Sequence, residues 1–108
     1  MKEKNTMPTE TCTLVATAIP NPNPENAADM QTYMQKVTPL LMALEGGPPR
    51  RMKVSEVVNG EGTGIVMLMD FPSREKLSAL FASEEYQALI PVRDRGFKSM
   101  NIWIAQPM

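Results

Sequence analysis

Apolar side chains follow one another without a break from Ile65 to Met69, in the run IVMLM. Successive side chains of a β-strand point to opposite faces of the sheet, so a strand without a polar position is typical of one covered on both faces. The run therefore predicts a central strand. Pro72 ends this strand because it cannot donate to a β-ladder, and Ser73 is placed to cap a following helix.

Three further segments have the patterns of strands. Thr11 to Ile19 is apolar on both alternating faces and predicts a second interior strand, which the proline-rich segment Pro20 to Pro24 ends. A clearer alternation of apolar and polar residues from Arg51 to Val58 predicts a half-exposed edge strand, and Asn59 to Gly62 is a hairpin signal because Asn and Gly accept positive φ. The last strand is expected at Ser99 to Ala105.

Helical periodicity is clearest after the proline-rich segment. Asn23 is the expected N-cap of this helix, and Pro39 is expected to kink it before a Gly-Gly-Pro-Pro sequence ends it. Shorter helical patterns follow Ser73 and Ser83, and the second is one helix only if it continues through Pro91. One apolar stripe marks the long helix: Met30, Tyr33, Met34, Val37, Leu41 and Leu44.

The order of these elements is β-α-β-β-α-β, which predicts an α+β protein of the ferredoxin-like plan. That plan is a four-stranded antiparallel sheet with helices on one face, and its central strands are the first and third, here the two most apolar. The other face is also apolar, so we expect a homodimer in which two sheets pack face to face as a dimeric α/β barrel. The candidate interface residues are Val15, Val66, Leu68 and Trp103; for Trp103 a pocket wall is the alternative.

Composition narrows the class of protein. The chain has 108 residues, 43% of them hydrophobic, which is typical of one globular domain; we expect it at residues 11–108, after a flexible N-terminal tail at residues 1–10. The net charge of −1 argues against nucleic acid as a partner, and Arg50 and Arg51 are expected to be solvated loop charges. No apolar run is long enough to cross a membrane.

The reactive residue types limit the chemistry. Histidine is absent, so no imidazole is available to ligate haem or a metal or to serve as the base of a nucleophilic dyad, and we expect neither metal nor cofactor. Cys12 is the only cysteine, which fits a reducing, cytoplasmic location; without a basic neighbour it is expected to be a packed thiol. Ten methionines indicate either a soft core or a plastic ligand-binding surface.

Four residues are candidates for contacting a ligand. Tyr33 either packs in the core or presents its hydroxyl to a cleft. Tyr86 and Arg93 are seven residues apart on one helix face, where the guanidinium could bind an anionic ligand or brace the helix through an ion pair. Glu56 lies on the same side of its predicted strand as the apolar residues. It is therefore either an inward carboxylate with a raised pKa or a solvated carboxylate.

Three short motifs resemble those of a known family: Phe71-Pro72-Ser73, Ser83-Glu84-Glu85-Tyr86-Gln87 and Pro91-Val92-Arg93. The pattern is similar to that of the small proteins grouped as domain-of-unknown-function family 1330, and the resemblance extends from about Cys12 to Ala105. It implies the fold of the dimeric α/β-barrel superfamily. That superfamily includes cofactor-independent monooxygenases, haem-degrading enzymes and small-ring isomerases, with sites between the helices and the sheet of each subunit.

The sequence therefore predicts a small homodimer that binds a small organic molecule between its sheet and its helices. Two alternatives stay open: a cofactor-independent enzyme of the monooxygenase or isomerase kind, and a purely structural dimer without a ligand. The absence of histidine argues against the haem-degrading branch of the superfamily.

Overall fold

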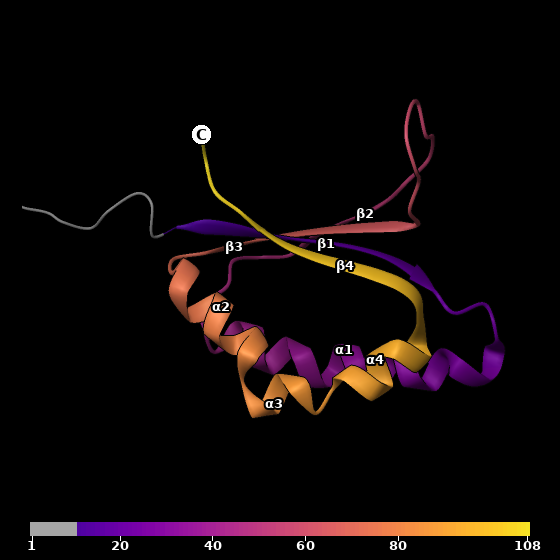
Figure 1. Cartoon of the computed structure of the whole chain (residues 1–108), viewed down its shortest axis with the longest axis horizontal. Coiled ribbons are helices and arrows are strands. Elements are labelled where there is room, and N and C mark those ends of the chain that lie inside the picture. Colours follow the sequence, from indigo (N-terminus) through magenta and orange to yellow (C-terminus); the bar gives the residue numbers. More distant parts are fainter. Residues whose placement is uncertain (1–10) are drawn as a thin grey trace, which may run out of the picture.

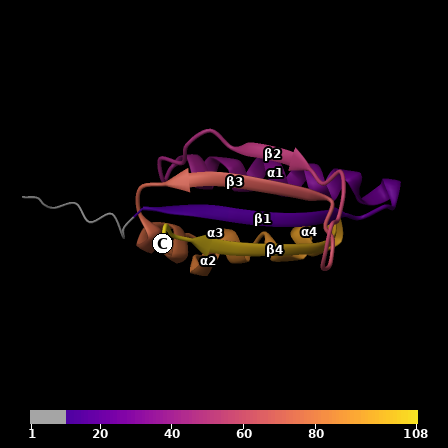
Figure 2. The ribbon, with the colours of Figure 1, turned by 90° about the horizontal axis from the view of Figure 1, so that it is seen from above.

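Four antiparallel strands form one sheet in the order β2-β3-β1-β4 (Figures 1 and 2). The computed structural model describes residues 11–108, so the predicted tail at residues 1–10 lies outside the described residues. The strands are β1 (Cys12–Pro20), β2 (Arg50–Lys53), β3 (Ile65–Phe71) and β4 (Phe97–Ala105). The helices are η2 (Pro24–Asn26), α1 (Ala27–Met42), α2 (Arg74–Ala82), α3 (Glu84–Gln87) and α4 (Ile90–Gly96).

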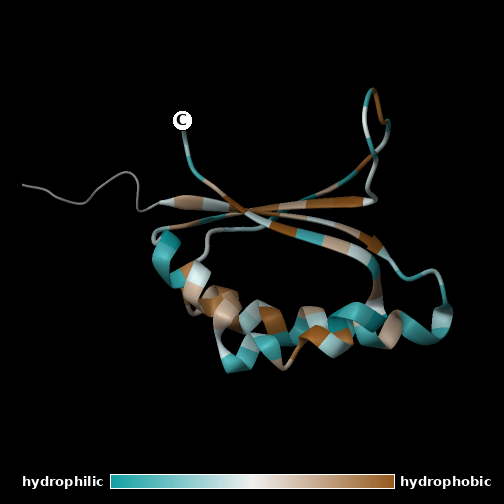
Figure 3. Cartoon of the chain, in the orientation of Figure 1, coloured by the Kyte–Doolittle hydropathy of each residue, from teal (hydrophilic) through white to brown (hydrophobic). Residues whose placement is uncertain are grey.

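The predicted ferredoxin-like arrangement is confirmed. The two most apolar strands, β1 and β3, are the central ones, and all the helices lie on one face of the sheet (Figure 1). Viewed from above, α1 lies beneath β2 and β3, whereas α2, α3 and α4 lie beneath the β4 side (Figure 2). Figure 3 shows that hydrophobic residues are concentrated in the strands, as expected for the centre of the domain.

The face of the sheet that carries no helix has a patterned surface. In the strand register Val15 lies between Leu68 on β3 and Trp103 on β4, and these three form an apolar row across the sheet. Polar pairs flank this row: Thr13 Oγ1 donates to Asp70 Oδ1 at 2.6 Å, and Asn101 Nδ2 donates to Thr17 Oγ1 at 3.0 Å. We call this surface the open face; it is apolar along its middle but not throughout.

The edge strand is shorter than the alternation predicted. β2 ends at Lys53, and the predicted strand residues beyond it belong to a loop of residues 54–64 that rises away from the sheet (Figure 1). The reason is that β3 begins only at Ile65, so this part of the loop has no strand to pair with. Val58 is 89% exposed as a result. The predicted tight hairpin is thus a longer loop, in which Gly60 adopts a φ of +86°.

The helix boundaries combine confirmed predictions and corrections. Ser73 and Ser83 both cap helices: their Oγ atoms accept 3.2 Å hydrogen bonds from the amides of Lys76 and Tyr86. Asn23 precedes the 3-10 turn η2 and makes no side-chain cap, so the prediction that it caps the long helix was wrong. α1 continues through Pro39 to Met42.

The last helical segment is divided at the proline. α3 ends at Gln87 and α4 begins at Ile90, so Pro91 lies in the first turn of a new helix, where its missing N–H costs nothing. α4 packs along α1, and the chain enters β4 directly after Gly96, the predicted stop of the helix. The backbones are close here: a Cβ added at Gly96 would lie 2.6 Å from the Met30 nitrogen and 2.8 Å from its Cα.

We predict that Gly96→Ala lowers the free energy of unfolding by about 3 kcal/mol, because the clash is with α1 backbone that cannot rotate away. Gly47→Ala is the matched control, since a Cβ there meets only the Asp70 carbonyl oxygen at 3.7 Å, an ordinary contact. Urea unfolding of both variants measures the difference. Equal stability of the two variants would show that α1 can move away from α4 at little cost.

Candidate functional site

A cavity of about 540 Å³ lies between the sheet and α1. Its roof is the helix-facing side of the central strands, where β1 contributes Leu14 and two small side chains, Ala16 and Ala18. Tyr33 and Val37 of α1 form the opposite wall. Because alanines stand at the centre of the roof, space is left that larger side chains would fill.

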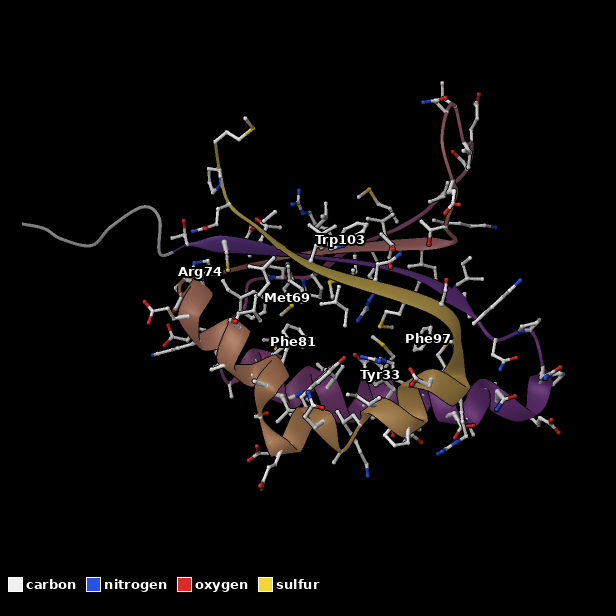
Figure 4. All side chains as sticks on the ribbon, viewed as in Figure 1. Tyr33, Met69, Arg74, Phe81, Phe97 and Trp103 are labelled. Atoms are coloured by element: carbon white, nitrogen blue, oxygen red, sulfur yellow. The ribbon has the colours of Figure 1, made fainter. Side chains whose placement is uncertain are left out.

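Methionines supply much of this lining. Six of the ten methionines in the chain border the cavity: Met30, Met34, Met42, Met67, Met69 and Met100. Thioether side chains are flexible and polarisable, so they adapt to differently shaped apolar ligands. Their location fits both interpretations of the methionine content, because Met69 belongs to the buried core and four of the others pack against it. Figure 4 shows Met69, Tyr33, Phe81 and Phe97 in the layer between the sheet and the helices.

The cavity opens between α1 and the edge strand β2. The exposed residues of its lining define the opening: Gln31, Gln35, Thr38 and Met42 on α1, and Pro49 and Arg51 beside and on β2. Arg51 is the one charged residue among the lining residues. The interior is thus apolar and the opening is polar, an arrangement typical of small-molecule sites.

A second, smaller hollow of about 320 Å³ lies on the β4 side of the helix layer. Tyr86, Arg93 and Gln87 line it, and Phe81 and Ile102 line both cavities. Aromatic rings fill the space between the two. Tyr86 meets Phe81 edge-to-face at 4.8 Å between ring centroids, and Tyr33 meets Phe97 in the same way at 5.7 Å.

Three of the four predicted ligand-contacting residues come together in one hydrogen-bonded chain. The hydroxyls of Tyr33 and Tyr86 lie 2.9 Å apart, and Arg93 Nη1 donates to the Tyr86 hydroxyl at 3.1 Å. Arg93 Nε also donates to Asp94 Oδ1 at 3.2 Å. Both tyrosines are buried, and Tyr33 lines the large cavity while Tyr86 lines the small one. The chain therefore joins the two cavities.

Burial determines the charge states in this chain. Burial first, and the hydrogen bond to Tyr86 second, raise the pKa of Tyr33 far above its usual range, so its hydroxyl stays neutral. Burial alone lowers the pKa of Arg93, but the hydrogen bonds to Tyr86 and Asp94 outweigh it and the net shift is upward. The chain therefore presents a neutral hydroxyl to the large cavity, with the positive charge held behind it.

The remaining candidate residues lie outside the hydrogen-bonded chain of Tyr33, Tyr86 and Arg93. Glu56 is exposed in loop 54–64, beyond the end of β2, which corresponds to the solvated carboxylate of the two alternatives. Cys12 is buried, and burial raises the pKa of its thiol, in agreement with a packed residue. Val15, Leu68 and Trp103 form the apolar row of the open face, and Val66 lies on the same face opposite Thr17.

Arg51 is the residue that sequence reasoning missed. It was expected to be a solvated loop charge, but it belongs to β2 and its register partner is Met67, which lines the cavity. The alternation Arg51-Met52-Lys53 could have indicated that one of these residues faces the cavity. Only the strand register shows which of them points toward the helices. Among residues 11–108, no group of three or more His, Cys, Asp or Glu side chains is placed to hold a metal, and no helix could cross a membrane.

The sheet order and the single layer of helices define a ferredoxin-like α+β protein, and solved structures of this kind align with the chain. A protein of unknown function from Rhodopseudomonas palustris aligns with a TM-score of 0.74 at 14% identity, over 93% of this chain and 84% of that one. A dimeric protein of unknown function from Bacteroides fragilis, with a ferredoxin-like fold, aligns with a TM-score of 0.60 at 10% identity, over 90% and 96%. A candidate antibiotic biosynthesis monooxygenase from Caulobacter crescentus aligns with a TM-score of 0.62 at 14% identity, over 93% and 92%.

The family follows from the sequence itself. The model of the family described as domain of unknown function DUF1330 matches residues 17–108, so the chain belongs to this family, as its three motifs predicted. No curated protein matches the chain. At such low identities, the likeness to solved structures carries the fold and not an activity.

We predict that Tyr86→Phe is more destabilising than Tyr33→Phe. Tyr86 is the middle of the hydrogen-bonded chain, so loss of its hydroxyl leaves the Tyr33 hydroxyl buried without its partner and Arg93 Nη1 without its acceptor, while Arg93 Nε keeps Asp94. We expect the free energy of unfolding to fall by about 2 kcal/mol. Tyr33→Phe removes one hydrogen bond and leaves Tyr86 paired with Arg93, so the free energy of unfolding should fall by only about 1 kcal/mol. Urea unfolding measures both; the reverse order would contradict the arrangement.

Proposed function

We propose that this protein binds a small, mainly apolar organic molecule in the cavity between α1 and the sheet. The observation that carries the proposal is the cavity itself: about 540 Å³, apolar inside and open to solvent at one polar rim. This volume lies within the range of natural small-molecule sites, roughly 300–1,000 Å³. A structural dimer without a ligand would have no use for an unfilled space of this size, since empty apolar cavities destabilise a core.

The polar group available inside the cavity favours binding over proton transfer. Tyr33 is the one lining residue with a hydroxyl deep in the apolar part, and its raised pKa keeps it neutral. A neutral phenol donates or accepts a hydrogen bond, which orients a ligand, but it does not abstract a proton. The enzymatic alternative draws on the monooxygenase description of the Caulobacter crescentus neighbour, which belongs to that protein.

We further propose that the protein is a homodimer joined through the open face. Trp103 is 54% exposed there, in a row with Val15 and Leu68, and Met52 at the edge is 49% exposed. Burying such a row in a dimer interface contributes about 25 cal/mol of favourable free energy for each Å² of apolar surface removed from water. The flanking pairs Thr13–Asp70 and Asn101–Thr17 would form a polar rim. The Bacteroides fragilis neighbour, described as dimeric, supports this assembly.

Loop 54–64 supports the same proposal. It extends from the sheet on the side of the open face, away from the helices (Figure 1). Val57 and Val58 are 50% and 89% exposed on it. A loop with two exposed valines beside a partly apolar face is well placed to contact the second subunit, and contact there would remove these side chains from water.

We predict that the protein binds Nile red, a neutral dye whose emission shifts to the blue in apolar surroundings, and that Ala16→Phe weakens this binding at least tenfold, about 1.4 kcal/mol. The added ring would occupy the centre of the cavity roof. Ala16→Leu should give an intermediate loss. Fluorescence titration measures the affinities, and thermal melting checks that the variants are folded.

Ala79→Phe is the control, because Ala79 is exposed on α2 and lines neither cavity. It should leave dye binding unchanged. Dye binding that survives Ala16→Phe undiminished would place the dye on another surface and contradict the proposal. Absence of dye binding to the wild type would favour the structural dimer.

We predict that the wild type sediments as a dimer at micromolar concentration and that Met52→Glu and Trp103→Glu shift it toward monomer. Both substitutions place a charge on the open face, where pairing would bury it. Met42→Glu is the matched control: Met42 is 51% exposed, nearly as much as Met52, but lies on α1. A monomeric wild type, or equal dissociation of the Met52 and Met42 variants, would contradict the interface.

A further inference from the structure

The strand register fixes one positive charge at the opening of the cavity. Arg51 lies opposite Met67, whose side chain lines the cavity, so Arg51 points to the helix side of the sheet. Its neighbours Arg50 and Met52 lie opposite Leu68 and Val66 and therefore point to the open face. Of the two consecutive arginines, one thus belongs to the cavity and the other to the opposite surface.

This charge has no counter-ion among the described residues. Within residues 11–108 Arg51 forms neither an ion pair nor a side-chain hydrogen bond, whereas Arg93 and Arg95 pair with Asp94 and Asp29. The lining of the cavity contains no carboxylate. The other polar groups at the opening are the amides of Gln31 and Gln35, which can donate hydrogen bonds to an anion. The opening is therefore electropositive and rich in donors.

We propose that the cavity takes an amphipathic monoanion: a carboxylate with an apolar tail or ring system, its head group on Arg51 and its apolar part among the methionines. This proposal rests on the proposed binding function and names the ligand class. The guanidinium presents a planar fork of N–H donors that matches a carboxylate. A single cation suits a singly charged head, because a dianionic phosphate would require more than one positive partner.

The interior agrees with this ligand class. An apolar chain that enters beside β2 reaches Met67 on β3 and then the small side chains of Ala16 and Ala18 on β1, in the order of the strands. The Tyr33 hydroxyl shares a hydrogen bond with Tyr86 and is neutral, so it can bind a polar group of the ligand but gives no ionic partner to a charged head. A charged head at the inner end would lose its hydration without an ionic partner, and the ligand is therefore oriented with its head at Arg51.

The experiment compares ligands that share a tail and differ in head group: dodecanoate, 1-dodecanol and dodecylammonium, each displacing bound Nile red below its micelle concentration at a pH where the carboxylate is ionised. For the wild type we expect dodecanoate to displace the dye at a concentration about five- to tenfold below that of dodecanol, and dodecylammonium to be the weakest. Added salt should reduce the preference, because the opening is exposed.

Arg51→Gln should abolish the preference for dodecanoate over dodecanol, and Arg51→Lys should keep part of it. Both ligands are compared on the same variant, so that any change in Nile red affinity cancels. Lys53→Gln is the matched control: it removes the same charge from the same strand and the same side of the sheet, but Lys53 does not line the cavity. The Lys53→Gln variant should prefer dodecanoate over dodecanol as strongly as the wild type does.

The outcomes separate the two proposals. Nile red binding without any head-group preference, or a preference that survives Arg51→Gln, would overturn the amphipathic anion and leave the cavity as a binding site. If the dye does not bind, calorimetric titration of dodecanoate decides: binding that Arg51→Gln weakens supports the anion, and absence of binding overturns both proposals.

Discussion

The close approach of α4 to α1 at Gly96 is the contact on which the helix layer depends. Because Gly96 has no side chain, α4 can lie against the backbone of α1 at Met30, and the two helices pack along each other. α1 also faces the central strands, and the cavity lies between them, bordered by Ala16 and Ala18 of β1. The same helix thus takes part in the close contact with α4 and in the wall of the cavity.

The tyrosine pair has a related role within this layer. Tyr33 from α1 and Tyr86 from α3 meet through their hydroxyls, and Arg93 from α4 joins them, so one hydrogen-bonded chain ties three helices together. Two buried hydroxyls in an apolar layer would be costly if either lacked a partner. Their mutual satisfaction fixes the relative positions of the helices, and it leaves the large cavity with a neutral hydroxyl and the small one with a guanidinium.

The sequence predicted best those features that depend on local pattern. The two-sided apolarity of β1 and β3 identified the central strands, and the caps Ser73 and Ser83 were read directly from residue type. The seven-residue spacing of Tyr86 and Arg93 placed them in contact even though the helix between them is broken. The two residues are about two helical turns apart, and their contact is kept because the helix resumes after only two residues.

Features that depend on pairing partners could not be read in the same way. The length of β2 is set by where β3 begins, and nothing in the run from Arg51 to Val58 reveals this. Two residues show the effect: Glu56, for which inward and solvated positions both stayed open, lies exposed in the loop, and Arg51, expected to be a solvated loop charge, lines the cavity. The place of Glu56 follows from where β2 ends. That of Arg51 follows from the register, because a shift of one residue exchanges the faces of a strand.

The same alternation separates the two proposed roles of the sheet. Ala16 borders the cavity and Val15 lies on the open face, and the pattern repeats on β2 with Arg51 and Met52. Each of these side chains belongs to one surface only, so substitutions can alter ligand binding and self-association independently. Any effect of an open-face substitution on the cavity must then pass through the strand backbone itself. Because β1 is hydrogen-bonded on both sides along its length, that backbone has little freedom to move, and we expect the two surfaces to act independently.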